Sequence, residues 1–157
     1  MSGLEDLYRE IILDHYRNPV GRGLREPFEA QVHHVNPTCG DEITLRVHLD
    51  GEGDSATVVD ISYDNQGCSI SQASASVMYE LLLGHTVAEA MATQEAFLGL
   101  MQSATDAAAP EPDEDVLEDA IAFSGVAKYP ARVKCALLSW MAWKDAVTQA
   151  LTTGGTR

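Results

Sequence analysis

The sequence contains no run of about 20 consecutive apolar residues, which is the length that spans a bilayer. Its first residues also lack the basic region and apolar block of a secretory signal. Apolar residues nevertheless make up 45% of the 157 residues, which is too many for a disordered chain and suits one domain with a hydrophobic core. We therefore expect a single cytoplasmic domain over residues 1–157 that has no membrane partner.

Basic residues are scarce. Ten Lys and Arg stand against 24 Asp and Glu, a formal net charge of −14, and no Lys or Arg occurs from Val47 to Ala127. An acidic surface of this kind repels phosphate backbones, so nucleic acid is excluded as a partner. Basic residues return as Lys128, Arg132 and Lys134, close to the last cysteine.

Cysteine is also rare, and the three present, Cys39, Cys68 and Cys135, lie far apart. An odd number of distant cysteines does not suit a disulfide framework, which in any case needs an oxidising compartment. Each cysteine could instead be a metal ligand, a reactive thiol or an inert core residue.

The periodicity of the apolar residues predicts an α+β domain. A helix, then three strands, then further helices indicate a three-stranded antiparallel sheet with helices packed on one face. A segment around 104–115 holds Ala, Pro and acids without periodicity, and predicts a mobile acidic loop. The expected helices are 4–16, 69–83, 86–101, 113–123 and 130–151, and the expected strands are 28–35, 43–49 and 57–63.

The three cysteines fall at informative places in this layout. Cys39 lies between the first two strands, Cys68 lies where the third strand gives way to a helix, and Cys135 lies in the first turns of the last helix. Loops at one end of a sheet and a nearby helix start could bring all three together.

The neighbours of each cysteine suggest reactivity. Pro37 and Gly40 fix a tight turn that places Cys39 and Asp41 on the same side. A glycine precedes Cys68 and allows close backbone approach, and the helix start that follows lowers the pKa of a thiol. Arg132 and Lys134 lie within a helical turn of Cys135. We therefore expect all three surroundings to favour the thiolate.

Three thiolates and one carboxylate suit a tetrahedral zinc site, and a sulfur-rich set also suits iron in a cluster. The spacing itself is weak evidence, because the chain has no Cys-x-x-Cys pair. From the chemistry of the residues alone, a metal or thiol site and three unrelated core cysteines both remain open. The five histidines are expected to be structural or exposed, and Trp140 and Trp143 to belong to the core.

Three motifs carry a family resemblance. Pro-Thr-Cys-Gly-Asp at 37–41, Gly-Cys-Ser-Ile-Ser at 67–71 and a cysteine in the final helix resemble the IscU/NifU-like family of iron–sulfur scaffold proteins. Within that family the chain is similar to the SufU branch. Lys134 stands where the IscU branch usually has a histidine, and the 101–115 region looks like the insertion of the SufU branch.

The resemblance implies an IscU/NifU-like fold and a zinc ion held by Cys39, Asp41, Cys68 and Cys135. It further implies that a SufS-type cysteine desulfurase passes persulfide sulfur to Cys39, and that the sulfur then goes to the SUF cluster-assembly machinery. Arg132 matches a basic residue that the branch keeps near the site, with Lys134 beside it.

The activity expected is that of a zinc-dependent sulfurtransferase acting with the desulfurase. The alternative is a scaffold on which a [2Fe–2S] cluster is assembled and released. A third possibility is a closed structural zinc domain, which would have no need of a reactive loop cysteine with an adjacent carboxylate.

Overall fold

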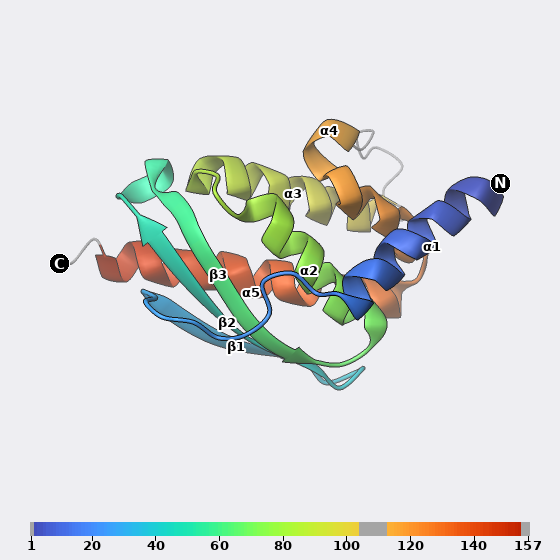
Figure 1. Cartoon of the computed structure of the whole chain (residues 1–157), viewed down its shortest axis with the longest axis horizontal. Coiled ribbons are helices and arrows are strands. Elements are labelled where there is room, and N and C mark those ends of the chain that lie inside the picture. The colour runs from blue at the N-terminus through green and yellow to red at the C-terminus, as the bar shows by residue number, and fades with distance from the viewer. Residues whose placement is uncertain (1, 104–112, 155–157) are drawn as a thin grey trace.

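The computed structural model of the chain describes residues 2–103 and 113–154, and Figure 1 shows their arrangement. Strands β1 (Ala30–Asn36), β2 (Asp41–Asp50) and β3 (Thr57–Gln66) form one antiparallel sheet in the order β1-β2-β3. The predicted α+β class and three-stranded antiparallel sheet are confirmed.

One face of the sheet is apolar and the helices cover it (Figure 1). Ile43, Leu45 and Val47 alternate along β2 and are at most 1% exposed, as the period of two predicts. α5 (Pro130–Gly154) packs against β1 and β2 and contributes Trp140 and Trp143, both fully buried as expected. The other helical elements are α1 (Ser2–Arg17), α2 (Ser69–Leu82), α3 (Val87–Gln102), α4 (Glu114–Leu117) and η2 (Glu118–Lys128).

The predicted helix over 113–123 is wrong. α4 has only four residues, and the chain continues as a 3₁₀ helix, η2. Glu118 separates them with a φ of 44°, a left-handed conformation that interrupts α-helical hydrogen bonding. Asp113 caps α4 through its carboxylate, and residues 104–112 of the predicted acidic loop lie outside the described residues.

His15 ties α1 to the helices beside it. Its ring is 5% exposed, its Nδ1 lies 2.7 Å from Ser76 Oγ on α2, and its Nε2 lies 3.1 Å from Asp119 on η2 and 3.4 Å from Glu80. These side chains give the imidazole polar partners at both nitrogens, which agrees with the structural role expected for it. No helix in residues 2–103 or 113–154 is long and apolar enough to cross a membrane.

Candidate metal centre

Three segments meet at one end of the sheet and bring the cysteines together. The turn between β1 and β2 carries Cys39, the N-terminus of α2 follows Cys68, and the second turn of α5 carries Cys135. The turn is held by the amides of Cys39 and Gly40, which donate to Asn36 O at 3.3 and 2.9 Å. Gly40 has a φ of 72°, which glycine adopts without strain.

The donor atoms form one compact group. Cys39 Sγ lies 3.1 Å from Cys135 Sγ, and one donor atom each of Cys39, Asp41 and Cys135 lies within 4.8 Å of the other two. Cys68 Sγ adjoins the group at 3.9 Å from Asp41 Oδ2. All three cysteines are free thiols. The four side chains expected as ligands are thus neighbours, and Cys39, Asp41 and Cys135 could together hold a metal ion.

Asp41 and Cys68 are fixed to each other through the backbone. The amide of Cys68 donates to Asp41 Oδ1 at 2.9 Å, and Cys68 Sγ in turn accepts from the amide of Ser71 at 3.5 Å as the N-cap of α2. Gly67 allows this close approach, because a Cβ built there would lie 2.1 Å from Asp41 Oδ1. Its φ of 142° also disfavours any other residue.

We expect Gly67→Ala to destabilise the fold by about 2–4 kcal/mol and to weaken metal binding, because the new methyl group displaces the Asp41 carboxylate. Gly99→Ala is the matched control: Gly99 lies inside α3 with nothing near its Cβ position, so alanine should stabilise by about 0.5–1 kcal/mol. Urea unfolding and metal content measured on both variants check this. Equal stability of the two variants would contradict it.

Asp41 is buried without a positive partner. Its side chain is 0% exposed, and no Lys, Arg or His of the described chain pairs with it. A buried carboxylate costs free energy unless a cation or hydrogen bonds compensate it. A metal ion at the cysteine group would supply the missing positive charge, so the donor set fits a bound cation.

The pKa of the Cys135 thiol contradicts one expectation. Burial raises it well above the usual range, and the nearby Cys39, Asp41 and Cys68 side chains raise it further. Arg132 and Lys134 do not offset this, because both are exposed and neither makes an ion pair with any described residue. The expectation that Cys135 favours the thiolate is therefore wrong for the metal-free chain. A bound cation would favour the Cys135 thiolate instead, since a coordinated thiol is deprotonated.

The three cysteines differ in accessibility. Cys39 is exposed, Cys68 is half-buried and Cys135 is buried. Cys39 is therefore the cysteine that an approaching partner reaches most easily.

Two residues that contact the site, Asn36 and Ala131, were not predicted from the sequence. Asn36 Nδ2 donates to Cys135 Sγ at 3.9 Å, and the Ala131 carbonyl lies 3.6 Å from Cys135 Sγ and 4.0 Å from Cys39 Sγ. Asn36 stands directly before the Pro-Thr-Cys-Gly-Asp motif. Its burial, at 7% exposure, is visible in the structure but has no signal in the sequence.

Several known proteins are similar to this chain in sequence. The model of the NifU-like N-terminal domain matches residues 7–136. The chain is 40% identical to the zinc-dependent sulfurtransferase SufU of Bacillus subtilis, over 94% of both chains. It is 36% identical to the iron–sulfur cluster assembly scaffold protein IscU of Streptococcus pyogenes, over 96% of this chain and 88% of that protein.

A solved structure extends the comparison to three dimensions. The crystal structure of a putative iron–sulfur cluster assembly scaffold protein for the SUF system, from Fervidobacterium islandicum, superposes with a TM-score of 0.77 at 36% identity and covers 88% of this chain and 94% of that one. Since both the family model and these relatives extend over most of the sequence, the resemblance drawn from the three cysteine motifs is confirmed, and the chain belongs to the NifU-like N-terminal domain family.

Proposed function

We propose that this protein is a zinc-dependent sulfur carrier for iron–sulfur cluster assembly. In this proposal it accepts persulfide sulfur from a SufS-type cysteine desulfurase on Cys39 and passes it to the SUF machinery. The observation that carries the proposal is an exposed thiol, Cys39, placed against a buried thiol and a buried carboxylate that has no cationic partner in the described chain. The name of the B. subtilis relative, a zinc-dependent sulfurtransferase, points the same way, and the F. islandicum protein, described as a scaffold, supports the link to the SUF system.

Zinc is the metal that the donors suit best. Cys39, Cys68 and Cys135 would offer sulfur and Asp41 oxygen, the set of four that tetrahedral zinc accepts. The ion would neutralise part of the negative charge of the ligands and keep the thiols deprotonated. The chain's own contribution is to hold the side chains in place: Asp41 is fixed by the amide of Cys68, and Cys135 by its helix.

Sulfur transfer needs the Cys39 thiolate accessible and not engaged by the metal, because a coordinated thiolate is a poor nucleophile. The sulfur of Cys39 attacks the outer sulfur of the desulfurase persulfide, so a new S–S bond forms on Cys39 while the S–S bond of the desulfurase breaks. The electron pair leaves with the desulfurase cysteine as a thiolate, and no external oxidant or reductant is consumed. The exposed cations Arg132 and Lys134, on the same helix as Cys135, would support this anionic exchange.

The second candidate function is a scaffold for a [2Fe–2S] cluster, and the same thiols favour it. The scaffold protein IscU of S. pyogenes is 36% identical to this chain, which supports that alternative. The two functions differ in the metal retained on purification, because zinc leaves the protein colourless and a cluster makes it brown.

We expect the zinc-loaded protein to increase the turnover of cysteine by a SufS-type desulfurase severalfold, because an efficient acceptor removes the persulfide that limits the enzyme. Sulfide released by a thiol reductant, measured with and without the protein, checks this, together with elemental analysis that should find about one zinc per chain. The chelated protein is the control. No increase in turnover, or iron in place of zinc, would favour the scaffold.

A further inference from the structure

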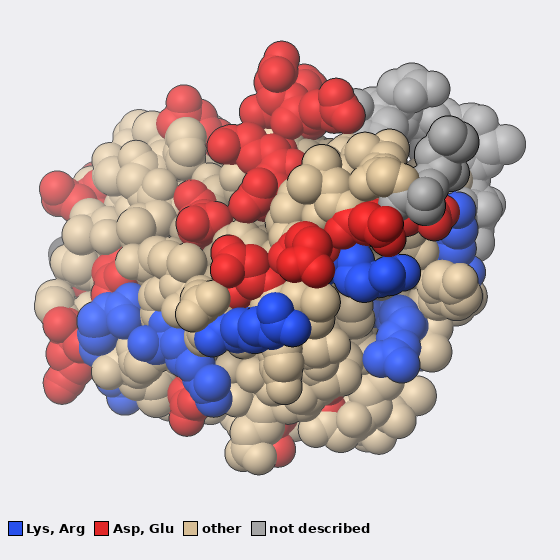
Figure 2. Space-filling view, turned by 45° about the vertical axis from the view of Figure 1, so that its right-hand side comes forward, with Lys and Arg blue, Asp and Glu red and all other residues tan. Residues whose placement is uncertain are grey.

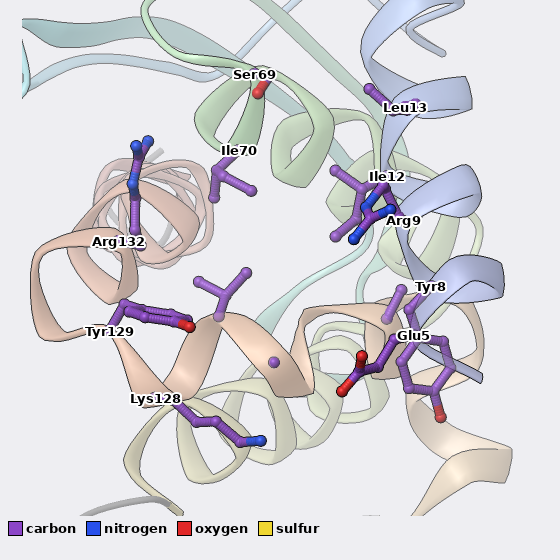
Figure 3. A pocket seen from close by; sticks show the side chains of 13 residues that line it. Glu5, Tyr8, Arg9, Ile12, Leu13, Ser69, Ile70, Lys128, Tyr129 and Arg132 are labelled. Carbon is purple, nitrogen blue, oxygen red and sulfur yellow. The ribbon is translucent and has the colours of Figure 1, made fainter. Parts of the chain in front are cut away.

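A groove opens beside the metal centre. Its volume is about 550 Å³, within the range of sites that bind ligands or partner side chains, and it lies between α1, the start of α2, η2 and the first turn of α5. Figure 3 shows Glu5, Arg9 and Ile12 of α1 across the opening from Ile70, Tyr129 and Arg132.

The groove adjoins the cysteines through the chain itself. Ser69, in its lining, follows Cys68, and Arg132 precedes Cys135 by one helical turn. The Ala131 carbonyl, next to Arg132, faces the sulfurs of Cys39 and Cys135. A partner seated in the groove would therefore lie next to the metal centre.

The floor of the groove is apolar. Ile12, Ile70 and Val126 contribute aliphatic side chains, and the ring of Tyr129 borders the groove although the residue is 62% exposed. An exposed aromatic residue beside aliphatic ones is typical of surfaces that bind other proteins.

The rim has the opposite charge from the rest of the protein. Among the residues that the structure describes, three basic ones line the groove, Arg9, Lys128 and Arg132, but a single acidic one does, Glu5. Arg9 is 3.5 Å from Asp6 in an exposed pair that contributes little, and the other two cations have no ion-pair partner among the residues placed by the structure. In Figure 2, basic side chains run across this face below a band of acidic ones.

We propose that this groove docks the desulfurase, through a segment of that enzyme that carries Asp or Glu around one large apolar side chain. The apolar side chain fills the floor and the carboxylates pair with Arg9, Lys128 and Arg132. Charge complementarity carries the assignment, because an acidic segment is repelled by most of this protein and attracted here. The inference rests on the proposed function and adds where and how the sulfur donor binds.

The test is reversal of charge at the rim. Arg9→Glu/Lys128→Glu changes the groove and leaves the cysteines and Arg132 intact. Arg17→Glu/Lys144→Glu makes the same change of charge on exposed residues outside the groove. Binding of each variant to the SufS-type desulfurase is measured by calorimetry at low and high salt, with zinc content and turnover measured on the same samples.

We expect the groove variant to bind at least about tenfold more weakly and to lose most of the salt dependence of binding. Its zinc content and its turnover at saturating concentration should match those of the wild type. The control should bind within about twofold of the wild type.

Three results would overturn the docking site: unchanged affinity of the groove variant, equal weakening in the control, or no binding of the wild-type protein to the desulfurase. A concentration-dependent dimer of the wild type that the groove variant abolishes would instead assign the groove to a second copy of the chain. Wild-type binding that does not stimulate turnover would refute the sulfur-carrier function alone, and the affinities would still decide the docking site.

Discussion

Cys39→Ala should abolish the stimulation and return turnover to that of the desulfurase alone, because the variant lacks the exposed thiol that takes the persulfide. The fold should persist with weaker zinc binding, since one ligand is lost but the residue is exposed and the turn keeps its backbone hydrogen bonds from the amides of Cys39 and Gly40 to Asn36. Sulfide release measures the loss. Thr38→Ala, a change at the neighbouring exposed residue, is the control and should keep full stimulation.

Cys39 is the expected acceptor because it is the most exposed of the three cysteines. Cys135 is 0% exposed and its protonated form is favoured by burial, so a donor protein could not reach it without opening α5. Cys68 is half-buried and its sulfur accepts the amide of Ser71 at the start of α2. Within the described chain, the sulfur of Cys39 contacts Cys135 Sγ at 3.1 Å and the Ala131 carbonyl at 4.0 Å.

Peptide mass spectrometry after incubation with desulfurase and cysteine locates the added sulfur. We expect it on Cys39, and its absence there in the alanine variant. Sulfur found mainly on Cys68 or Cys135, or full stimulation by Cys39→Ala, would show that another cysteine is the acceptor.

Local patterns in the sequence predicted most of the fold. The alternation of Ile43, Leu45 and Val47 marks a strand with one buried face, and all three are buried. The turn residues around Cys39 and the glycine before Cys68 are local requirements, so the sequence also indicates where these two thiols lie. The order of the elements predicted that these two thiols lie near Cys135. The β1–β2 turn and the start of α2 lie at the same end of the sheet, and the start of α5 reaches that end.

What the sequence did not reveal depends on tertiary contacts. The left-handed Glu118 that ends α4 has no sequence signal, because it is neither glycine nor asparagine. The pKa of Cys135 was misjudged because the charges next to it in sequence, Arg132 and Lys134, point to solvent while the thiol is buried. The groove is equally hidden, since its rim joins Arg9 to Lys128, which are more than a hundred residues apart.

Removal of zinc should have the other large effect, a loss of stability. When the free zinc concentration is about a thousand times the dissociation constant, zinc binding raises the free energy of unfolding by about 4 kcal/mol. For a chain of this length we expect a chelator to lower the melting temperature by about 8–16 °C. Scanning calorimetry with and without chelator measures this. An unchanged melting temperature would mean that the metal does not stabilise the fold.

Asp41→Asn tests whether Asp41 is a metal ligand or only a buried acidic residue. The amide oxygen can still accept from the amide of Cys68, but the negative charge is gone. In the metal-free protein the wild-type carboxylate is buried with no cation paired to it in the described chain, so asparagine should leave stability unchanged or raise it by about 1–2 kcal/mol. With zinc the order should reverse, because a neutral amide is a poorer ligand than a carboxylate.

The experiment therefore measures the melting temperature with zinc and with chelator for the wild type, Asp41→Asn and Asp64→Asn, and compares the three differences. Asp64 has a side chain that is 66% exposed and an exposed contact with Arg22, so its variant should gain from zinc as much as the wild type does. Asp41→Asn should gain clearly less. If its gain equals that of the wild type, Asp41 does not bind the metal, and the fourth donor has to come from elsewhere.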